Sequence, residues 1–121
     1  LRVPVDCREL ADVVAREHGN IHRSADFNAA AVLRLLERCD ALRRPERFCE
    51  VLLACECDAR GRLGLDAQPY PQAPRLQKAL NAALAVDTTT LAQDAAERGL
   101  KGPQIAGVVA QAREHAIGMA L

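Results

Sequence analysis

Apolar residues recur at helical spacing on both sides of one proline-rich stretch, and this pattern limits the chain to an all-helical fold. Three prolines fall within residues 69–74, where they argue against both helix and central strand. The stretch 61–74 is therefore predicted to be an extended connector with polyproline character. On either side of it, apolar residues repeat every three or four positions, as they do along one face of an amphipathic helix.

Six helices are predicted from this periodicity and from the residues that start and stop helices. Proline in a first turn opens the first and third helices, and Gly19 is interpreted as the stop of the first. The predicted ranges are 4–18, 29–42, 45–59, 74–86, 88–98 and 103–119. The predicted fold class is all-α, a helical bundle, with one unit over 1–60, the connector over 61–74 and a helical tail over 75–121.

Composition limits the core and the charge of this chain of 121 residues. With one Tyr and two Phe, the core must be built of Ala, Leu and Val. Sixteen basic residues balance sixteen acidic ones, so any contact with RNA must be a local patch. No signal peptide is expected, and no apolar run approaches the roughly 18 residues of a membrane span. Five cysteines without a CxxC pair are typical of reduced thiols, which favours a cytoplasmic location.

Two carboxylates, Asp40 and Asp58, are predicted to lie on the apolar sides of their helices. Asp40 follows Leu33 and Leu36 at helical spacing, and Asp58 follows Val51 and Cys55 in the same way. A buried carboxylate is costly unless an arginine, a backbone donor or a metal holds it. Two such residues indicate a polar site. The alternative is that each lies at the rim of the core, paired with one of Arg38, Arg43, Arg44, Arg47, Arg60 or Arg62.

Two histidines near the end of the first predicted helix complete the candidate site. His18 follows Val14 at i+4, and His22 lies just beyond Gly19. A histidine at a helix C-terminus is also a favourable cap, because its partial positive charge complements the helix dipole. No phosphate-binding loop of the GxxxxGK[ST] type, GxSxG or HExxH motif occurs, and no catalytic residue is assigned to the chain.

Basic residues at three places are candidate contacts for RNA phosphates. Arg43 and Arg44 belong to an arginine cluster, and Arg60 and Arg62 are predicted to end a helix and enter a glycine-flanked loop. Lys101 stands in a turn beside a helix start, a combination suited to phosphate. The alternative is a solvated network of ion pairs with Glu37, Glu46, Glu50, Glu56 and Asp58.

Five segments carry a family resemblance, in order along most of the chain. They are LRVPVDCRELADVVAREHGNIH (1–22), LLERCDALRRPERF (35–48), ACECDARGRLG (54–64), PYPQ (69–72) and the weaker GLKGPQI (99–105). Together they resemble the C-terminal part of the bacterial multifunctional CCA protein, a tRNA nucleotidyltransferase of the proteobacterial type. The final helix has a single arginine and is less basic than the resemblance leads us to expect.

The resemblance implies that residues 1–60 are the rear half of an HD-type phosphohydrolase domain, followed by a small helical tail. His18, His22 and one of Asp40 or Asp58 match the later half of its metal site. The His-Asp dipeptide of that site, and the paired carboxylates of nucleotidyl transfer, do not occur between Leu1 and Leu121. The chain is therefore expected to support the HD site and to dock tRNA, and to be inactive by itself.

The same resemblance implies cofactors and partners for the parent protein. Magnesium would serve nucleotidyl transfer, nickel or another transition metal would serve the HD domain, and neither is expected to bind this chain tightly. The expected partners are tRNA, CTP and ATP, with no membrane. The alternative function is a non-catalytic helical module for interdomain packing or dimerisation, including a homodimer of this chain. Convergence of His18, His22, Asp40 and Asp58 would favour the first function, and dispersal with separate arginine partners the second.

Overall fold

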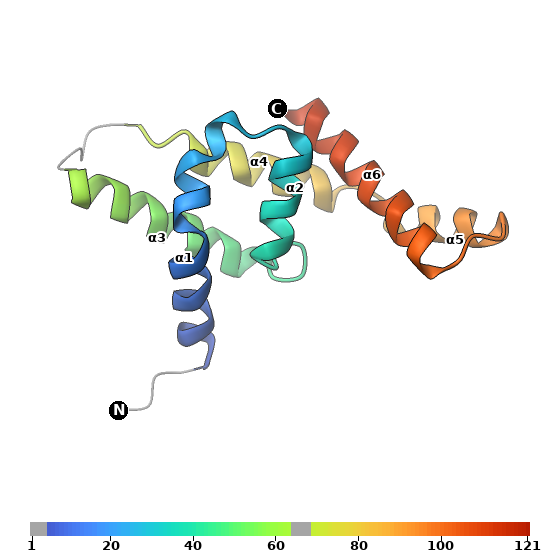
Figure 1. The fold of residues 1–121 in the computed structure, drawn as a ribbon, viewed down its shortest axis with the longest axis horizontal. Helices are drawn as coiled ribbons and strands as arrows, with labels where there is room; N and C mark the ends of the chain where they lie inside the picture. The colour runs from blue at the N-terminus through green and yellow to red at the C-terminus, as the bar shows by residue number, and fades with distance from the viewer. Residues whose placement is uncertain (1–4, 64–68) are drawn as a thin grey trace.

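The computed structural model describes residues 5–63 and 69–121, and within them the chain is helical throughout (Figure 1). It contains α1 (Val5–Arg23), the 3-10 helix η1 (Ser24–Asp26), α2 (Ala29–Arg38), α3 (Pro45–Leu63), α4 (Gln72–Leu84), α5 (Thr88–Glu97) and α6 (Gly102–Ala120). The predicted all-α class is confirmed, since the described residues form no strand. None of the helices described is both long enough and apolar enough to cross a membrane.

The core lies where α1, α2, α3 and α4 meet, together with the last part of α6. A helical hairpin formed by α5 and the first part of α6 extends away from this core (Figure 1). α1 packs against α3, and α4 packs against α2, α3 and α6. The later part of α6 reaches this core through Ile117, whereas its earlier part pairs with α5 in an arm that projects from the body (Figure 1). The largest fully buried side chains are Phe48, Ile21, Leu35, Leu36, Leu76, Leu80 and Ile117.

Helix starts follow the residues that cap them. Asn28 accepts a hydrogen bond from the Ala31 N–H at 2.9 Å, and Asp87 accepts one from the Thr90 N–H at 3.1 Å. α4 begins at Gln72, with Pro74 in its first turn, where the missing N–H leaves no intrahelical bond unmade. The predicted connector is therefore too long. Helix covers 61–63 and 72–74, and residues 64–68 lie outside the described part.

The ends of α1, α2 and α3 differ from the predicted ones by four or five residues. α1 continues through Gly19 to Arg23 because Ile21, in its last turn, is fully buried and offsets the cost of one helical glycine. α3 continues through Gly61 to Leu63. α2 stops earlier, at Arg38, because Asp40 adopts a left-handed conformation with φ of 56°. The Ala41 N–H then bonds the Leu36 carbonyl at 2.9 Å, as in a Schellman motif.

Candidate functional site

His22, in the last turn of α1, is bound at both of its ring nitrogens. Nδ1 lies 2.7 Å from the Tyr70 hydroxyl, and Nε2 lies 3.3 Å from Oδ2 of Asp58 on α3. Burial, together with the nearby charges of Cys55, Glu56 and Asp58, raises the pKa of Tyr70 well above its ordinary value, so its hydroxyl keeps the proton and can donate. In the neutral tautomer that donates to the carboxylate of Asp58, Nε2 carries the proton, and Nδ1 accepts from the Tyr70 O–H. This chain of hydrogen bonds joins α1, α3 and the segment before α4.

Residues at the start of α4 also bind the backbone at the end of α1 and just after it. Gln72 Nε2 donates to the His22 carbonyl at 2.8 Å. Arg75 donates to the carbonyls of Ser24 and Phe27, at 2.9 Å each. Sequence reasoning assigned no role to Tyr70, Gln72 or Arg75. The PYPQ segment of the family resemblance was the only signal for Tyr70 and Gln72, and Arg75 lies outside that segment. The contacts of all three residues reach about 50 positions back along the chain.

His18 lies one turn before His22, and the two rings meet edge to face with centroids 5.8 Å apart. Its Nδ1 lies 3.0 Å from the Val14 carbonyl, four residues earlier in α1, and so carries the proton that donates to it. Because Nδ1 makes this bond, only Nε2 can take a further ligand. The proposed capping role for His18 does not hold, since α1 ends five residues later, at Arg23.

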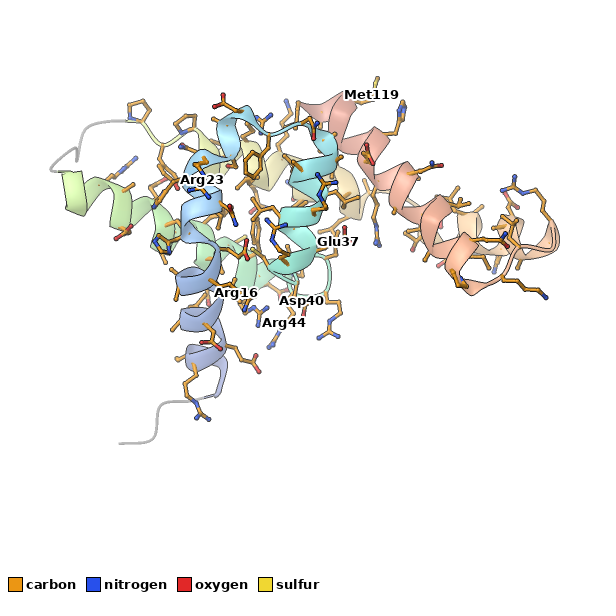
Figure 2. The ribbon with its side chains drawn as sticks, viewed as in Figure 1. Arg16, Arg23, Glu37, Asp40, Arg44 and Met119 are labelled. Carbon is orange, nitrogen blue, oxygen red and sulfur yellow. The ribbon has the colours of Figure 1, made fainter. Side chains whose placement is uncertain are left out.

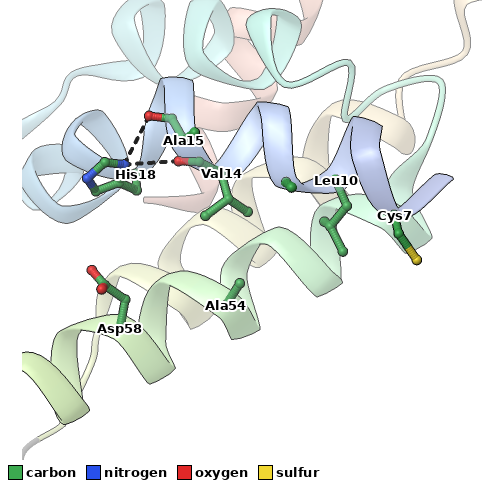
Figure 3. Close-up of a pocket in the computed structure, with 8 residues that line it drawn as sticks. Cys7, Leu10, Val14, Ala15, His18, Ala54 and Asp58 are labelled. Carbon is green, nitrogen blue, oxygen red and sulfur yellow. Dashed lines mark hydrogen bonds between the residues drawn. The ribbon is translucent and has the colours of Figure 1, made fainter. Parts of the chain in front are cut away.

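A shallow pocket of about 470 Å³ lies between α1 and α3, with His18 and Asp58 at one end and Cys7 at the other (Figure 3). Its walls are apolar or small. They are formed by Leu10, Ala11, Val14 and Ala15 of α1 and by Ala54 of α3. The polar end of this pocket therefore carries an imidazole and a carboxylate, while its length is apolar.

Asp40 does not join this group, and its predicted position on an apolar face is wrong. It lies in the turn after α2, near Arg44 (Figure 2), and its side chain is 37% exposed. Its Oδ2 lies 3.1 Å from Nη2 of Arg43, which is the ion pair that the rim alternative predicted. Asp58 is also part-exposed, at 41% of its side chain, and it pairs with His22.

The residues present do not complete a metal site. His22 uses both ring nitrogens in hydrogen bonds, and His18 offers one nitrogen. Within residues 5–63 and 69–121, no three His, Cys, Asp or Glu side chains are arranged to hold a metal ion. A metal at this position would need donors from elsewhere, as the resemblance to half of an HD-type site implies.

Glu17 is a buried carboxylate that the sequence analysis did not identify. It is 3% exposed and accepts hydrogen bonds from Asn20 Nδ2 and from Arg38 Nε of α2, each at 3.0 Å. Burial would raise the pKa of Glu17. The hydrogen bonds from Asn20 and Arg38, with the charges of Arg38 and Arg16, outweigh burial and leave the pKa below its ordinary value. The group therefore ties α1 to α2 as an ionised carboxylate.

The first arginine cluster is paired with acids, although the main partner differs from those predicted. Arg44 Nη1 lies 2.7 Å from Oε2 of Glu9 on α1, and Arg47 Nη1 lies 3.4 Å from the same oxygen. Arg47 also donates to the Cys39 carbonyl at 3.1 Å. The Arg43 side chain is 79% exposed beyond its pair with Asp40. Glu9 was missed because it precedes these arginines by 35 or more positions.

The other basic candidates lie apart from this cluster. Arg60 is inside α3 rather than in a loop, and its Nη2 lies 3.5 Å from Oε2 of Glu56, one turn earlier. The side chain of Arg62 lies outside the described part of the structure. Lys101 is exposed at the start of α6, where its backbone N–H donates to Oε1 of Gln104 at 2.9 Å.

Comparisons with known proteins confirm the resemblance over nearly the whole chain. The chain is 65% identical over 117 residues to the multifunctional CCA protein of Paracidovorax citrulli, 62% identical over 117 residues to that of Acidovorax sp. strain JS42, and 60% identical over 121 residues to that of Cupriavidus metallidurans. These matches cover 97 to 100% of the chain. The chain spans 28% of the length of these curated relatives, in their C-terminal part. No protein-family model matches the chain, and no solved structure matches it.

Proposed function

We propose that this chain serves as the C-terminal part of a CCA-adding and CCA-repairing tRNA nucleotidyltransferase. The observation that carries the proposal is the 65% identity to a multifunctional CCA protein across 97% of the chain. Nucleotidyl transfer needs paired carboxylates that hold metal ions at the reacting phosphate, and these would come from the preceding part of such a protein. The partners of the whole protein would be tRNA, CTP and ATP, in the cytoplasm.

Within that protein, residues 1–60 would form the rear half of an HD-type domain. His18 and Asp58 line one end of the pocket between α1 and α3, and His22 contacts both of them, which supports this proposal. Of the two aspartates left open by the sequence, Asp58 is favoured, because Asp40 is paired with Arg43 in the turn after α2. Nickel or another transition metal at the HD site, and magnesium at the nucleotidyltransferase site, remain proposals that depend on donors outside this chain.

The tail would dock on tRNA. The arm formed by α5 and α6 projects from the body and presents Lys101 at its far turn (Figure 1). Arg43 is mostly exposed, and Arg60 is 40% exposed beside Glu56. Arg43, Arg44, Arg60, Arg62 and Lys101 therefore remain the proposed contacts with phosphate. Each contact of this kind strengthens RNA binding and makes it more dependent on salt.

One observation favours the alternative of a non-catalytic helical module. Both ring nitrogens of His22 are satisfied within the chain, by Tyr70 and Asp58, as they would be if this group served packing alone. In that case the apolar pocket would serve interdomain packing or a homodimer, and substitutions of basic residues would leave tRNA affinity unchanged.

A chimera separates the two functions. The chain replaces the matched segment of the Paracidovorax citrulli protein, and tRNA binding is measured as a function of salt. We expect Arg60→Ala with Arg62→Ala to weaken binding and to reduce the salt slope by about one to two. The matched pair, Arg43→Ala with Arg44→Ala, should lower stability more than affinity, because Arg44 binds Glu9 across helices. If the first double variant changes only the melting temperature, the tRNA-contact proposal for these residues fails.

A further inference from the structure

The two helices beside the pocket expose a face that is unusual for a helix in contact with water. Cys7, Ala11 and Ala15 of α1 lie at four-residue spacing and are exposed, and the half-buried Leu10 and Val14 lie beside them. On α3, the small residue Ala54 forms the facing wall of the pocket. A helix face turned to solvent normally carries charged residues. Among the pocket residues, only Asp58 carries a full charge, and it lies at one end (Figure 3).

The shape of this face suits a third helix. Small residues repeated every four positions allow another helix to approach closely and place its ridge in the groove between α1 and α3. A helix also satisfies its own backbone hydrogen bonds, so it can cover an apolar groove without adding buried unpaired groups. Covering the pocket would bury Leu10, Val14 and Ala54 further, and removing their apolar surface from water would stabilise the docked helix.

The comparisons indicate where such a helix would come from. The chain matches the C-terminal 28% of its relatives, so most of their polypeptide precedes the matched segment. Cys7, which lines the pocket, lies two residues after the first residue of α1, so the pocket begins near the start of that helix. A tethered helix has an effective concentration in the millimolar range, which gives it an advantage of about a thousandfold over a second copy at micromolar concentration.

We propose that in the full-length protein this groove is filled by an amphipathic helix from the polypeptide that precedes α1. This inference rests on the proposed function, because it takes the chain as part of a longer CCA protein. The apolar face of that helix packs on Leu10, Val14 and Ala54. A polar residue of the same helix must lie at the end formed by His18 and Asp58, because their polar atoms would otherwise be covered by apolar groups.

The cysteines of the chain provide a test with internal controls. Cys7 lines the groove and is exposed, and Cys49 is exposed on the side of α3 that faces α4, where its Sγ lies 3.1 Å from Gln77 Oε1. Cys39 and Cys55 are buried, and burial raises the pKa of their thiols to about 12 and about 11. Both should therefore resist a maleimide in the folded chain.

Maleimide labelling is measured in the isolated chain and in the Paracidovorax citrulli chimera, and each labelled cysteine is identified by peptide mass spectrometry. The isolated chain is kept below about 1 µM to limit its self-association. We expect Cys7 to react at least about tenfold more slowly in the chimera than in the isolated chain, which corresponds to protection by about 1.4 kcal/mol or more. Cys49 should react at the same rate in both proteins. Equal rates for Cys7 in the two proteins would overturn the inference.

A pair of substitutions keeps the test independent of folding. Ala11→Arg in the groove and Ala96→Arg on the exposed face of α5 add the same side chain at exposed helical positions. Both should leave the isolated chain stable. In the chimera, only Ala11→Arg should restore labelling of Cys7, and no restoration would overturn the inference. Addition of CCA by the chimera is measured separately. Protection of Cys7 without CCA addition would support the groove and count against the proposed function.

Discussion

Removing the Arg38 guanidinium should destabilise the chain by leaving the buried carboxylate of Glu17 short of a partner. Arg38 Nε donates to Glu17 at 3.0 Å, and the Glu17 side chain is only 4% exposed. A hydrogen bond to a charged group is worth about 1.5–3 kcal/mol. Glu17 would keep Asn20 at 3.0 Å and the exposed Arg16 at 3.6 Å, so we expect a loss near the lower half of that range, about 2 kcal/mol.

The variant is Arg38→Met, which keeps an apolar stem of similar length and so preserves packing. For a chain of 121 residues, a loss of about 2 kcal/mol corresponds to a fall in melting temperature of roughly 8 °C. Thermal and urea unfolding followed by circular dichroism at pH 7 measure both quantities. Arg34→Met is the matched control, because Arg34 is exposed on the same helix and the change of charge is the same. Its effect should stay within about 0.5 kcal/mol.

The effect of Arg38→Met should depend on pH with a definite sign. The folded-state pKa of Glu17 lies below its ordinary value of 4.5, because hydrogen bonds and charges outweigh the effect of burial. Its ionised form therefore contributes stability that is fully present above the unfolded pKa and is lost as the pH falls through the folded pKa. The difference between the original chain and Arg38→Met should shrink below pH 4.5. An effect no larger than that of Arg34→Met, or one that is unchanged at low pH, would refute the reasoning.

Three further predictions concern the turns, the His22 group and activity. Tyr70→Phe should lower the free energy of unfolding by about 1 kcal/mol in urea unfolding, because it removes one hydrogen bond to a part-buried histidine; no change would mean that Tyr70 does not bind His22. Gly99→Ala should lower the free energy of unfolding by about 1 kcal/mol, because φ at this position is 82°, although the added Cβ meets no other atom. Asp40→Gly should raise the free energy of unfolding by about a few tenths of a kcal/mol, because Asp40 also has a positive φ. If both variants changed stability in the same direction, the left-handed Schellman geometry would be contradicted. The isolated chain should neither hydrolyse a 2′,3′-cyclic nucleotide nor add CCA with any divalent metal, and hydrolysis abolished by His22→Ala would contradict this.

The sequence predicted where helices begin better than where they end. The starts of α2, α3 and α5 match because they depend on local signals, which are the caps Asn28 and Asp87 and the proline at 45. The ends of α1 and α3 did not match. A helical glycine costs about 1 kcal/mol, so burial of a single residue such as Ile21 can carry the helix past it.

The candidate site could be predicted only in part, for a similar reason. The family resemblance named His18, His22 and Asp58, which the structure places in two adjacent helices. It could not separate Asp58 from Asp40, because the left-handed turn that removes Asp40 from the face of α2 is not marked by glycine. Tyr70 and Glu17 were missed because each gains its role from a partner on another element, at 48 and 21 positions of separation.

Addition of CCA by the chimera tests the central proposal most directly. The chain replaces the matched 28% of the Paracidovorax citrulli protein, and incorporation of CTP and ATP into a tRNA that lacks its 3′ end is measured beside the native protein and a version truncated before the segment. We predict a rate within about tenfold of the native protein, a barrier difference below about 1.4 kcal/mol, and a much lower rate after truncation. A folded chimera no more active than the truncated protein would contradict the proposal that this chain serves as the C-terminal part of a CCA-adding enzyme.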